Sequence, residues 1–189
     1  FSFPYFSRDI AEFWRRWHIS LSTWFRDYLY IPLGGSRGGT WMKIRNTFII
    51  FIVSGFWHGA NWTFIVWGTL NAVYFLPLLL TNKNRNNLGI VAQGKYIPTL
   101  KEVFQILITF GLTVLAWVFF RAENIGHAFQ YISDLFANPS SYLSLGIYWK
   151  YRFLLLSIFI FLFIEWMGRE QEYAIEKNIL TWKKPIRYA

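Results

Sequence analysis

The segment from Asn46 to Asn82 runs for 37 residues without a single Lys, Arg, Asp or Glu. As one helix it would extend about 55 Å, whereas the hydrocarbon core of a bilayer is about 30 Å thick. The segment must therefore break, and we expect the break between Ser54 and Asn61, where Gly55 and Gly59 lie. Irregular backbone at membrane depth is tolerated only next to protein or a wet cavity, so the break predicts a cavity there.

Two further apolar segments are long enough to cross a bilayer, Val103 to Phe120 and about Tyr148 to Trp166. Only 15% of the residues are charged, whereas soluble domains carry about 25%. The sequence thus predicts an all-α, polytopic membrane helical bundle with a broken segment. A soluble helical protein is the less favoured alternative.

The net charge of +9 comes from cations scattered at the ends of the apolar segments. That pattern is typical of lipid head-group contacts and does not favour nucleic-acid binding. The basic stretch from Thr81 to Lys101 is predicted to be a cytoplasmic loop. Two crossings later a basic tail should lie on the same side, with Lys177, Lys183, Lys184 and Arg187.

The stretch from Arg8 to Tyr30 has helical periodicity, with an apolar stripe opposite a charged face. Asp9 and Glu12 are placed to cap its start, and the Gly-rich turn from Pro32 to Thr40 ends it. Such a helix is too charged to cross lipid alone, so we expect it at the membrane interface or docked in the bundle. A short amphipathic helix is predicted from Ile125 to Phe136.

His58 is the only side chain in the uncharged segment that titrates near neutral pH. An ionisable group inside a membrane is a functional hypothesis by default. His18 lies at the edge of an aromatic stripe, where an ordinary interfacial role is the alternative. His127 lies on the polar side of the short helix and is predicted to be merely solvated.

A neutral imidazole can take a proton from an alcohol that attacks an acyl thioester, while a second polar group orients a reactant. The site must exclude water, and we expect Trp57 and Trp62 to line it. The sequence has no GxSxG, HExxH or P-loop motif, so neither a serine-hydrolase triad nor a metal site is predicted. For Asn61, capping of the second half-helix is as good an interpretation as a catalytic role.

Three stretches together resemble the membrane-bound O-acyltransferase (MBOAT) family, in its alginate O-acetyltransferase branch. They are FWRRWHISLSTWFRDYLYIPLGG from Phe13 to Gly35, SGFWHGA from Ser54 to Ala60, and the C-terminal pair of WVFFRA from Trp117 with Glu165-Trp166. The resemblance covers most of the chain. It identifies residues 1–189 as the C-terminal part of a single membrane domain whose N-terminal half is absent.

The resemblance implies an O-acyltransferase of the bacterial cytoplasmic (inner) membrane. Its motif histidines map onto His58, as the catalytic residue, and His18. It also implies an acyl thioester donor such as acetyl-CoA rather than a tightly bound cofactor, an extracytoplasmic polysaccharide acceptor, and an extracytoplasmic acetyltransferase partner that finishes the transfer. With the N-terminal half missing, donor-tunnel residues and activity are expected to be missing from the fragment.

Two alternatives stay open at this point. The D-alanyl transferases of teichoic acids share the segment around His18, although Tyr30 to Gly35 is more like the alginate branch. In the second alternative the chain is a non-catalytic membrane scaffold or channel, and the histidines only brace a polar passage. Arg15, Arg16 and Arg26 are candidates for contacts with donor phosphates, or with lipid head groups.

Overall fold

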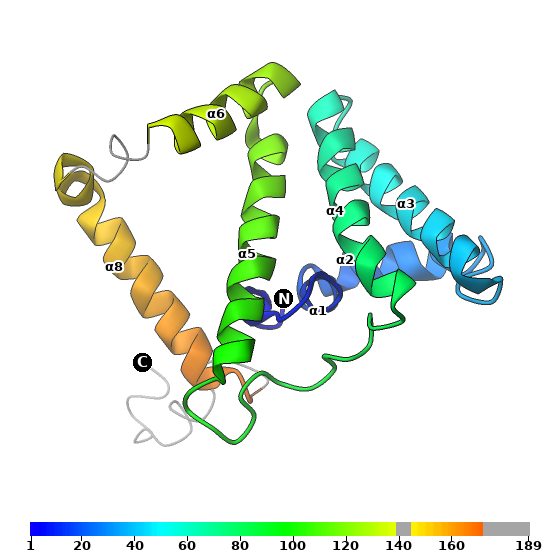
Figure 1. Cartoon of the computed structure of the whole chain (residues 1–189), viewed down its shortest axis with the longest axis horizontal. Coiled ribbons are helices and arrows are strands. Elements are labelled where there is room, and N and C mark those ends of the chain that lie inside the picture. Colours follow the sequence, from blue (N-terminus) through cyan, green and yellow to red (C-terminus); the bar gives the residue numbers. More distant parts are fainter. Residues whose placement is uncertain (139–144, 172–189) are drawn as a thin grey trace, which may run out of the picture.

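The computed structural model describes residues 1–138 and 145–171, and every regular element in these two ranges is helical. The predicted all-α fold is therefore confirmed. The predicted basic tail with Lys177, Lys183, Lys184 and Arg187 lies outside the described residues. In chain order the elements are η1 (Pro4–Phe6), α1 (Ile10–Arg16), α2 (Ile19–Phe25), η2 (Arg26–Tyr30), α3 (Gly39–His58), α4 (Trp62–Leu80), α5 (Leu100–Arg121), α6 (Ile125–Ala137) and α8 (Leu145–Gly168) (Figure 1).

Helices α3 and α4 form the predicted break as a tight hairpin. Helix α3 ends at His58 and α4 begins at Trp62, so only three residues make the turn. The Asn61 side chain accepts a hydrogen bond from the Thr63 N–H at 3.1 Å and donates one to the Glu123 carbonyl at 2.9 Å. Its capping role is confirmed, and the same side chain ties the hairpin turn to the junction between α5 and α6.

Two glycines let α3 and α4 pack backbone to backbone. A Cβ atom at Gly55 would lie 2.3 Å from the Phe64 carbonyl oxygen, and one at Gly68 would lie 2.2 Å from the Phe51 carbonyl oxygen. Small residues at such crossings are typical of helix pairs in membranes, where close van der Waals contact drives association. These contacts set how closely α3 approaches α4, and His58 is the last residue of α3.

Helices α4, α5 and α8 are long and apolar enough to cross a membrane, with mean hydropathy of 1.7, 2.2 and 1.7. The two predicted spans after the basic loop are thus confirmed as α5 and α8. Only 6% of the apolar window of α8 is buried in the protein, against 33% for α4. Figure 1 shows α8 leaning away from α5, with the two helices close together at one end.

A small hydrophobic core holds α4, α5 and α6 together. Trp67 of α4, Ala116 and Phe119 of α5, and Ala128 of α6 form one buried cluster. The predicted short amphipathic helix is confirmed as α6, which presents Ala128 to this cluster. His127 on the same helix is exposed, as predicted.

The predicted single helix from Arg8 to Tyr30 is wrong, because the chain breaks it at His18. Asp9 does cap its first part, accepting the Glu12 N–H at 2.7 Å. Trp17 then ends α1 and packs on Phe13 at 5.4 Å, and on Trp117 of α5 at 5.2 Å, between ring centroids. We attribute the turn at the next residue to these tertiary contacts, which override the helical periodicity.

The second part of this stretch is also irregular. Helix α2 is followed directly by the π-helical turn η2, from Arg26 to Tyr30. Such turns insert one extra residue and occur often at functional sites. In Figure 1 the short elements α1 and α2 lie across one end of the longer helices, so the docked alternative for this stretch describes the structure.

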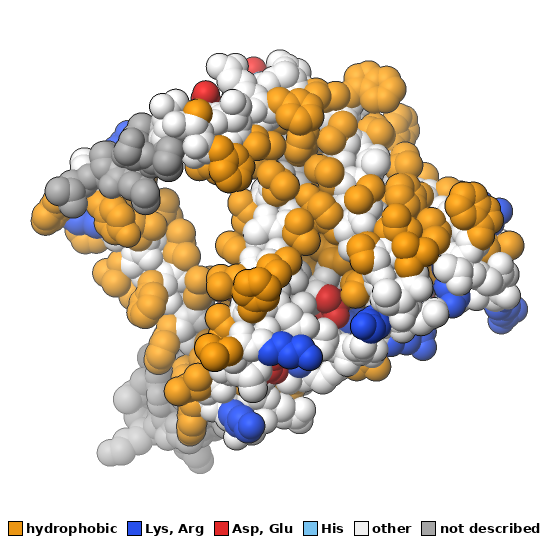
Figure 2. Space-filling model, viewed as in Figure 1, with side chains coloured by type: hydrophobic (Ala, Val, Ile, Leu, Met, Phe, Trp, Pro, Cys, Tyr) orange, Lys and Arg blue, Asp and Glu red, His pale blue; other side chains and the backbone are white. Residues whose placement is uncertain are grey.

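Arginines in and just before α1 hold the connector 81–99 against the bundle. Arg15 donates to the carbonyls of Asn84 and Asn87 at 2.9 and 2.8 Å, and Arg8 donates to the Gly89 carbonyl at 2.6 Å. Between Arg8 and Arg16 lies the buried carboxylate of Glu12, with ion pairs of 3.1 and 2.8 Å. Lys and Arg side chains accordingly gather along the lower edge of the molecule in Figure 2.

The end of α8 is fastened to the same connector. The buried guanidinium of Arg169 donates to the carbonyls of Val91 and Ala92 at 3.1 and 3.0 Å, and to that of Lys95. It also lies over the Trp166 ring, 4.1 Å from the centroid. The basic end of the molecule is therefore a hydrogen-bonded layer that collects α1, the connector and α8.

Candidate active site

His58 ends α3 inside a group of aromatic rings. Its ring centroid lies 5.0 Å from that of Phe120 and 5.2 Å from that of Trp67, while Phe64 is 6.4 Å away. The side chain is half-buried, and within the described ranges neither ring nitrogen has a hydrogen-bond partner. The packing thus fixes the ring but leaves both nitrogens available to a reactant.

His18 occupies a backbone conformation that few side chains adopt. Its φ of 41° and ψ of 56° are left-handed, and it stands between α1 and α2 as the N-cap of α2. Histidine is one of the residues enriched in this region, although the conformation still costs energy and is often found at functional sites. The half-buried imidazole lies against Phe1, 5.6 Å between centroids.

The structure brings the two predicted histidines together. Trp17, next to His18, packs on Trp117, whereas His58 packs on Phe120. Trp117 and Phe120 are three residues apart and share one face of α5, so Trp17 and His58 contact the same face of that helix. The two imidazoles are also close enough to interact electrostatically.

The aromatic rings around His58 match the predicted ones only in part. The Trp57 ring packs on His58 as predicted, 5.2 Å between centroids, although Trp57 is 60% exposed. Trp62 is 71% exposed and has no ring contact with His58 in the described residues. The other rings around His58 are those of Phe64 and Trp67 of α4 and Phe120 of α5, which the sequence did not predict.

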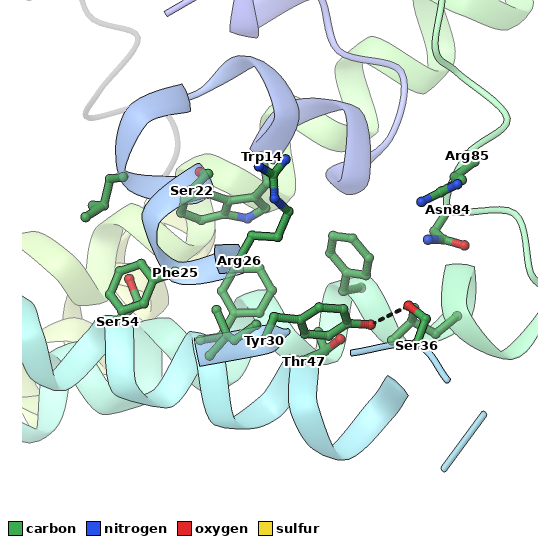
Figure 3. Close-up of a pocket in the computed structure, with 15 residues that line it drawn as sticks. Trp14, Ser22, Phe25, Arg26, Tyr30, Ser36, Thr47, Ser54, Asn84 and Arg85 are labelled. Atoms are coloured by element: carbon green, nitrogen blue, oxygen red, sulfur yellow. Dashed lines mark hydrogen bonds between the residues drawn. The ribbon is translucent and has the colours of Figure 1, made fainter. Parts of the chain in front are cut away.

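The bundle contains a cavity of about 260 Å³ close to His58, which we call the groove (Figure 3). Four of its lining residues come from α3, at spacings of three, one and three, and therefore share one helix face. His58 follows the last of them, Ser54, by four residues, so it continues that face. The predicted cavity at His58 is thus displaced by one helical turn. The groove is lined by Trp14, Leu21, Ser22, Phe25, Arg26, Tyr30, Ser36, Thr47, Ile50, Phe51, Ser54, Phe75, Leu79, Asn84 and Arg85.

Most of the polar and basic lining lies away from Ser54. In Figure 3 Arg85 and Asn84 lie on the far side from Ser54, and Tyr30 and Ser36 share a hydrogen bond of 2.9 Å. Arg26 reaches the groove from η2 and pairs with Asp27 at 2.7 Å. This hydrogen bond from Arg26 lowers the pKa of the exposed Asp27 carboxyl, so the pair stays ionised near neutral pH.

Two residues of the groove were not predicted from the sequence, and two of the three candidate arginines lie outside it. Arg85 and Asn84 belong to the basic connector, and nothing in their spacing indicates that they fold back beside α3. Arg15 and Arg16 were candidates for donor phosphates, but their guanidiniums hold the connector and Glu12. Of the three predicted arginines, only Arg26 lines the groove.

Comparison with known proteins gives a decisive match. The family model of the membrane-bound O-acyltransferases, MBOAT, matches residues 4–121, a region that holds both histidines and the whole groove. The chain belongs to this family. The resemblance drawn from its sequence motifs is therefore confirmed.

The MBOAT chain is similar to several curated proteins. It is 46% identical over 137 residues to the probable alginate O-acetylase AlgI of Pseudomonas aeruginosa, covering 72% of this chain and 24% of the relative. It is 42% identical over 135 residues to a peptidoglycan O-acetyltransferase of Helicobacter pylori, covering 71% and 24%. A teichoic acid D-alanyltransferase of Streptococcus thermophilus is 35% identical over 136 residues, covering 64% and 32%. The chain spans about a quarter of the length of the first two relatives.

Proposed function

We propose that the protein is a membrane O-acyltransferase in which His58 is the catalytic base and the groove holds the acyl donor. One observation carries the proposal: the face of α3 that lines the groove continues to the imidazole of His58. Family membership supports the reaction class, and the free nitrogens of His58 support its role.

The lining of the groove suits a thioester with a charged head and a less polar arm. Along α3, Thr47 and His58 are about 16 Å apart, which is the distance such an arm must bridge. Arg26 and Arg85 supply cations for phosphate groups, and serine and threonine hydroxyls line an otherwise largely apolar interior. Acetyl-CoA fits this description. Arg85 lies in the basic connector, which the positive-inside rule assigns to the cytoplasm.

The reaction needs one proton to move twice. A nitrogen of His58 accepts the proton of an acceptor hydroxyl as the hydroxyl oxygen attacks the thioester carbonyl carbon. The carbon–sulfur bond then breaks, and the departing thiolate takes the proton from the imidazolium. The products are an ester and a free thiol. His18 is the second polar group at the reacting centre, and the rings of Phe64, Trp67 and Phe120 limit access of water.

The acceptor we propose is a hydroxyl of an extracytoplasmic polysaccharide. The named activities of the alginate and peptidoglycan relatives support a glycan acceptor and an acetyl group. An extracytoplasmic acetyltransferase is the partner that would complete transfer to the sugar, and the bacterial inner membrane is the corresponding location. D-Alanyl transfer to teichoic acid is the second candidate, supported by the 35% identity to the D-alanyltransferase.

Substitution of the catalytic residue tests the proposal. His58→Ala in the full-length protein should reduce polysaccharide acetylation by at least about a hundredfold, because general-base catalysis contributes about 10² to 10⁴ in rate. Membrane insertion and expression should be unchanged. His127→Ala is the matched control, because His127 is exposed on α6. Near-normal acetylation by His58→Ala would remove His58 from the mechanism.

A second assay separates an enzyme from a scaffold or channel. Purified full-length protein in proteoliposomes should release free CoA thiol from acetyl-CoA when acceptor is present. D-Alanyl transfer would instead require a D-alanyl thioester as donor. A scaffold would consume neither donor.

A further inference from the structure

A second cavity, of about 710 Å³, opens beneath the connector at the basic end of the molecule. Arg8 and Asp9 border it from the segment before α1, while Thr99, Lys101 and Glu102 border it from the start of α5. The connector separates it from the groove: Asn84 and Arg85 face the groove, whereas Lys83 faces this second cavity. We call it the connector cavity.

Both carboxylates of the connector cavity are already engaged. Asp9 accepts the Glu12 N–H and the Asn87 side-chain amide, each at 2.7 Å. Glu102 accepts the N–H and hydroxyl of Thr99 at 2.9 Å and pairs with Arg8 at 3.5 Å. Both carboxylates keep their charge, but their hydrogen bonds and the one ion pair go to Arg8, Asn87, Thr99 and the backbone rather than to a lysine of the cavity.

Three lysines of the connector cavity are available to bind an anion. Lys83, Lys95 and Lys101 line it, and none has an ion pair with a carboxylate in the described parts of the chain. All three are exposed. An ammonium group offers three donors, and amide side chains complete a lining in which Leu78 and Ala92 are the apolar members. This composition suits a polar anion rather than an acyl chain.

We propose that the connector cavity binds phosphate groups, with Lys83, Lys95 and Lys101 as the cations that neutralise them. Two sources carry this chemistry, a soluble phosphate ester and the head group of an anionic lipid. The cavity lies beside the ends of the membrane helices α4 and α5, so both sources have access to it. The site is separate from the groove, so the proposal does not depend on the direction or donor of acyl transfer.

The soluble source is tested with inorganic pyrophosphate on full-length protein in phosphatidylcholine nanodiscs. The triple variant Lys83→Gln/Lys95→Gln/Lys101→Gln should raise the pyrophosphate Kd by about tenfold or more, because three charge-assisted contacts are lost. A control variant that removes three cations elsewhere should bind like the wild type; it carries Arg37→Gln, Lys43→Gln and Lys150→Gln. Thermal melting of both variants checks that the fold is retained.

The lipid source is tested by native mass spectrometry of the same proteins from nanodiscs that contain phosphatidylglycerol. The triple variant should retain fewer phosphatidylglycerol molecules than the wild type, whereas the control should retain as many. If the triple variant binds more weakly than the wild type in the pyrophosphate assay alone, the ligand is a soluble phosphate. If it binds more weakly in the lipid assay alone, the ligand is a lipid head group. Weaker binding in both assays means that the cavity takes both. An unchanged triple variant in both assays, or an equal loss in the control, would overturn the proposal.

Discussion

The two ends of this molecule are stabilised by different forces. Around His58 and His18 the contacts are aromatic: rings of α3, α4 and α5 surround His58 without hydrogen-bonding its nitrogens in the described ranges, and Phe1 lies against His18. At the basic end, buried Glu12 and Arg169 each engage several partners and fasten α1, the connector and α8. Aromatic packing therefore holds the imidazole of His58 without occupying its nitrogens, whereas hydrogen bonds and ion pairs hold α1, the connector and α8 in place.

The largest predicted effect is at the basic end. Glu12→Ala removes a buried carboxylate from between two guanidiniums and should lower the free energy of unfolding by about 3–5 kcal/mol, since unpaired buried charge remains. Thermal unfolding of detergent-solubilised protein measures it. Glu123→Ala removes an exposed carboxylate and serves as the control. Equal melting temperatures of the two variants would show that the ion pairs of Glu12 do not stabilise this end of the molecule.

At the aromatic end, His18→Asn removes the imidazole while keeping the backbone conformation of residue 18, so it separates the effects of the two. Asparagine tolerates the left-handed conformation of residue 18, so the fold should survive. Acetyl transfer should nevertheless fall about a hundredfold if the imidazole acts at the reacting centre. The transfer rate and the melting temperature of the variant are measured together. Full activity in a folded His18→Asn protein would show that His18 has only a structural role.

The hairpin that presents His58 depends on close backbone packing. Gly55→Leu would force a side chain against the Phe64 carbonyl and should cost about 1–3 kcal/mol of stability, with loss of activity as His58 shifts. Gly111→Leu is the matched control, because a Cβ atom at Gly111 meets nothing within 4 Å. Comparable behaviour of the two variants in melting and transfer assays would refute this role of Gly55.

The smallest predicted effect concerns the mouth of the groove. Arg26→Gln and Arg85→Gln should each raise the KM for acetyl-CoA by up to about tenfold while kcat changes little, because phosphate contacts are far from the reacting carbonyl. Steady-state kinetics in proteoliposomes measures this. Arg37→Gln, an exposed residue outside the groove, is the control. A fall in kcat without a change in KM would contradict the assignment.

Predictions from the sequence were correct where the composition of a segment or contacts between neighbouring residues determine the structure. The charge-free segments located α4, α5 and α8, and the Asn61 and Asp9 caps followed from side chains that bond to the backbone next to them. The break at His18 and the turn η2 were not foreseen, because tertiary contacts of Trp17 override a sound helical period. Arg85 joined the groove through hydrogen bonds that Arg15 makes to the connector, which local sequence does not encode.

The candidate site divides in the same way. His58 was predicted because an ionisable side chain stands out in an uncharged segment, and its catalytic role stays a prediction. Its aromatic surroundings were predicted only in part, since Trp57 packs on the imidazole but Trp62 does not. Phe120 lies 62 residues further along the chain and reaches His58 only through packing of α5 on the hairpin.

Protection of a single thiol tests the central claim that the groove delivers the donor to His58. The sequence contains no cysteine, so Ser54→Cys places a unique label site in this part of the protein, one turn before His58. Saturating acetyl-CoA should slow its modification by a small methanethiosulfonate reagent, and should leave a Thr40→Cys control at the exposed start of α3 unaffected. An unchanged labelling rate at position 54 in the presence of donor would contradict the account.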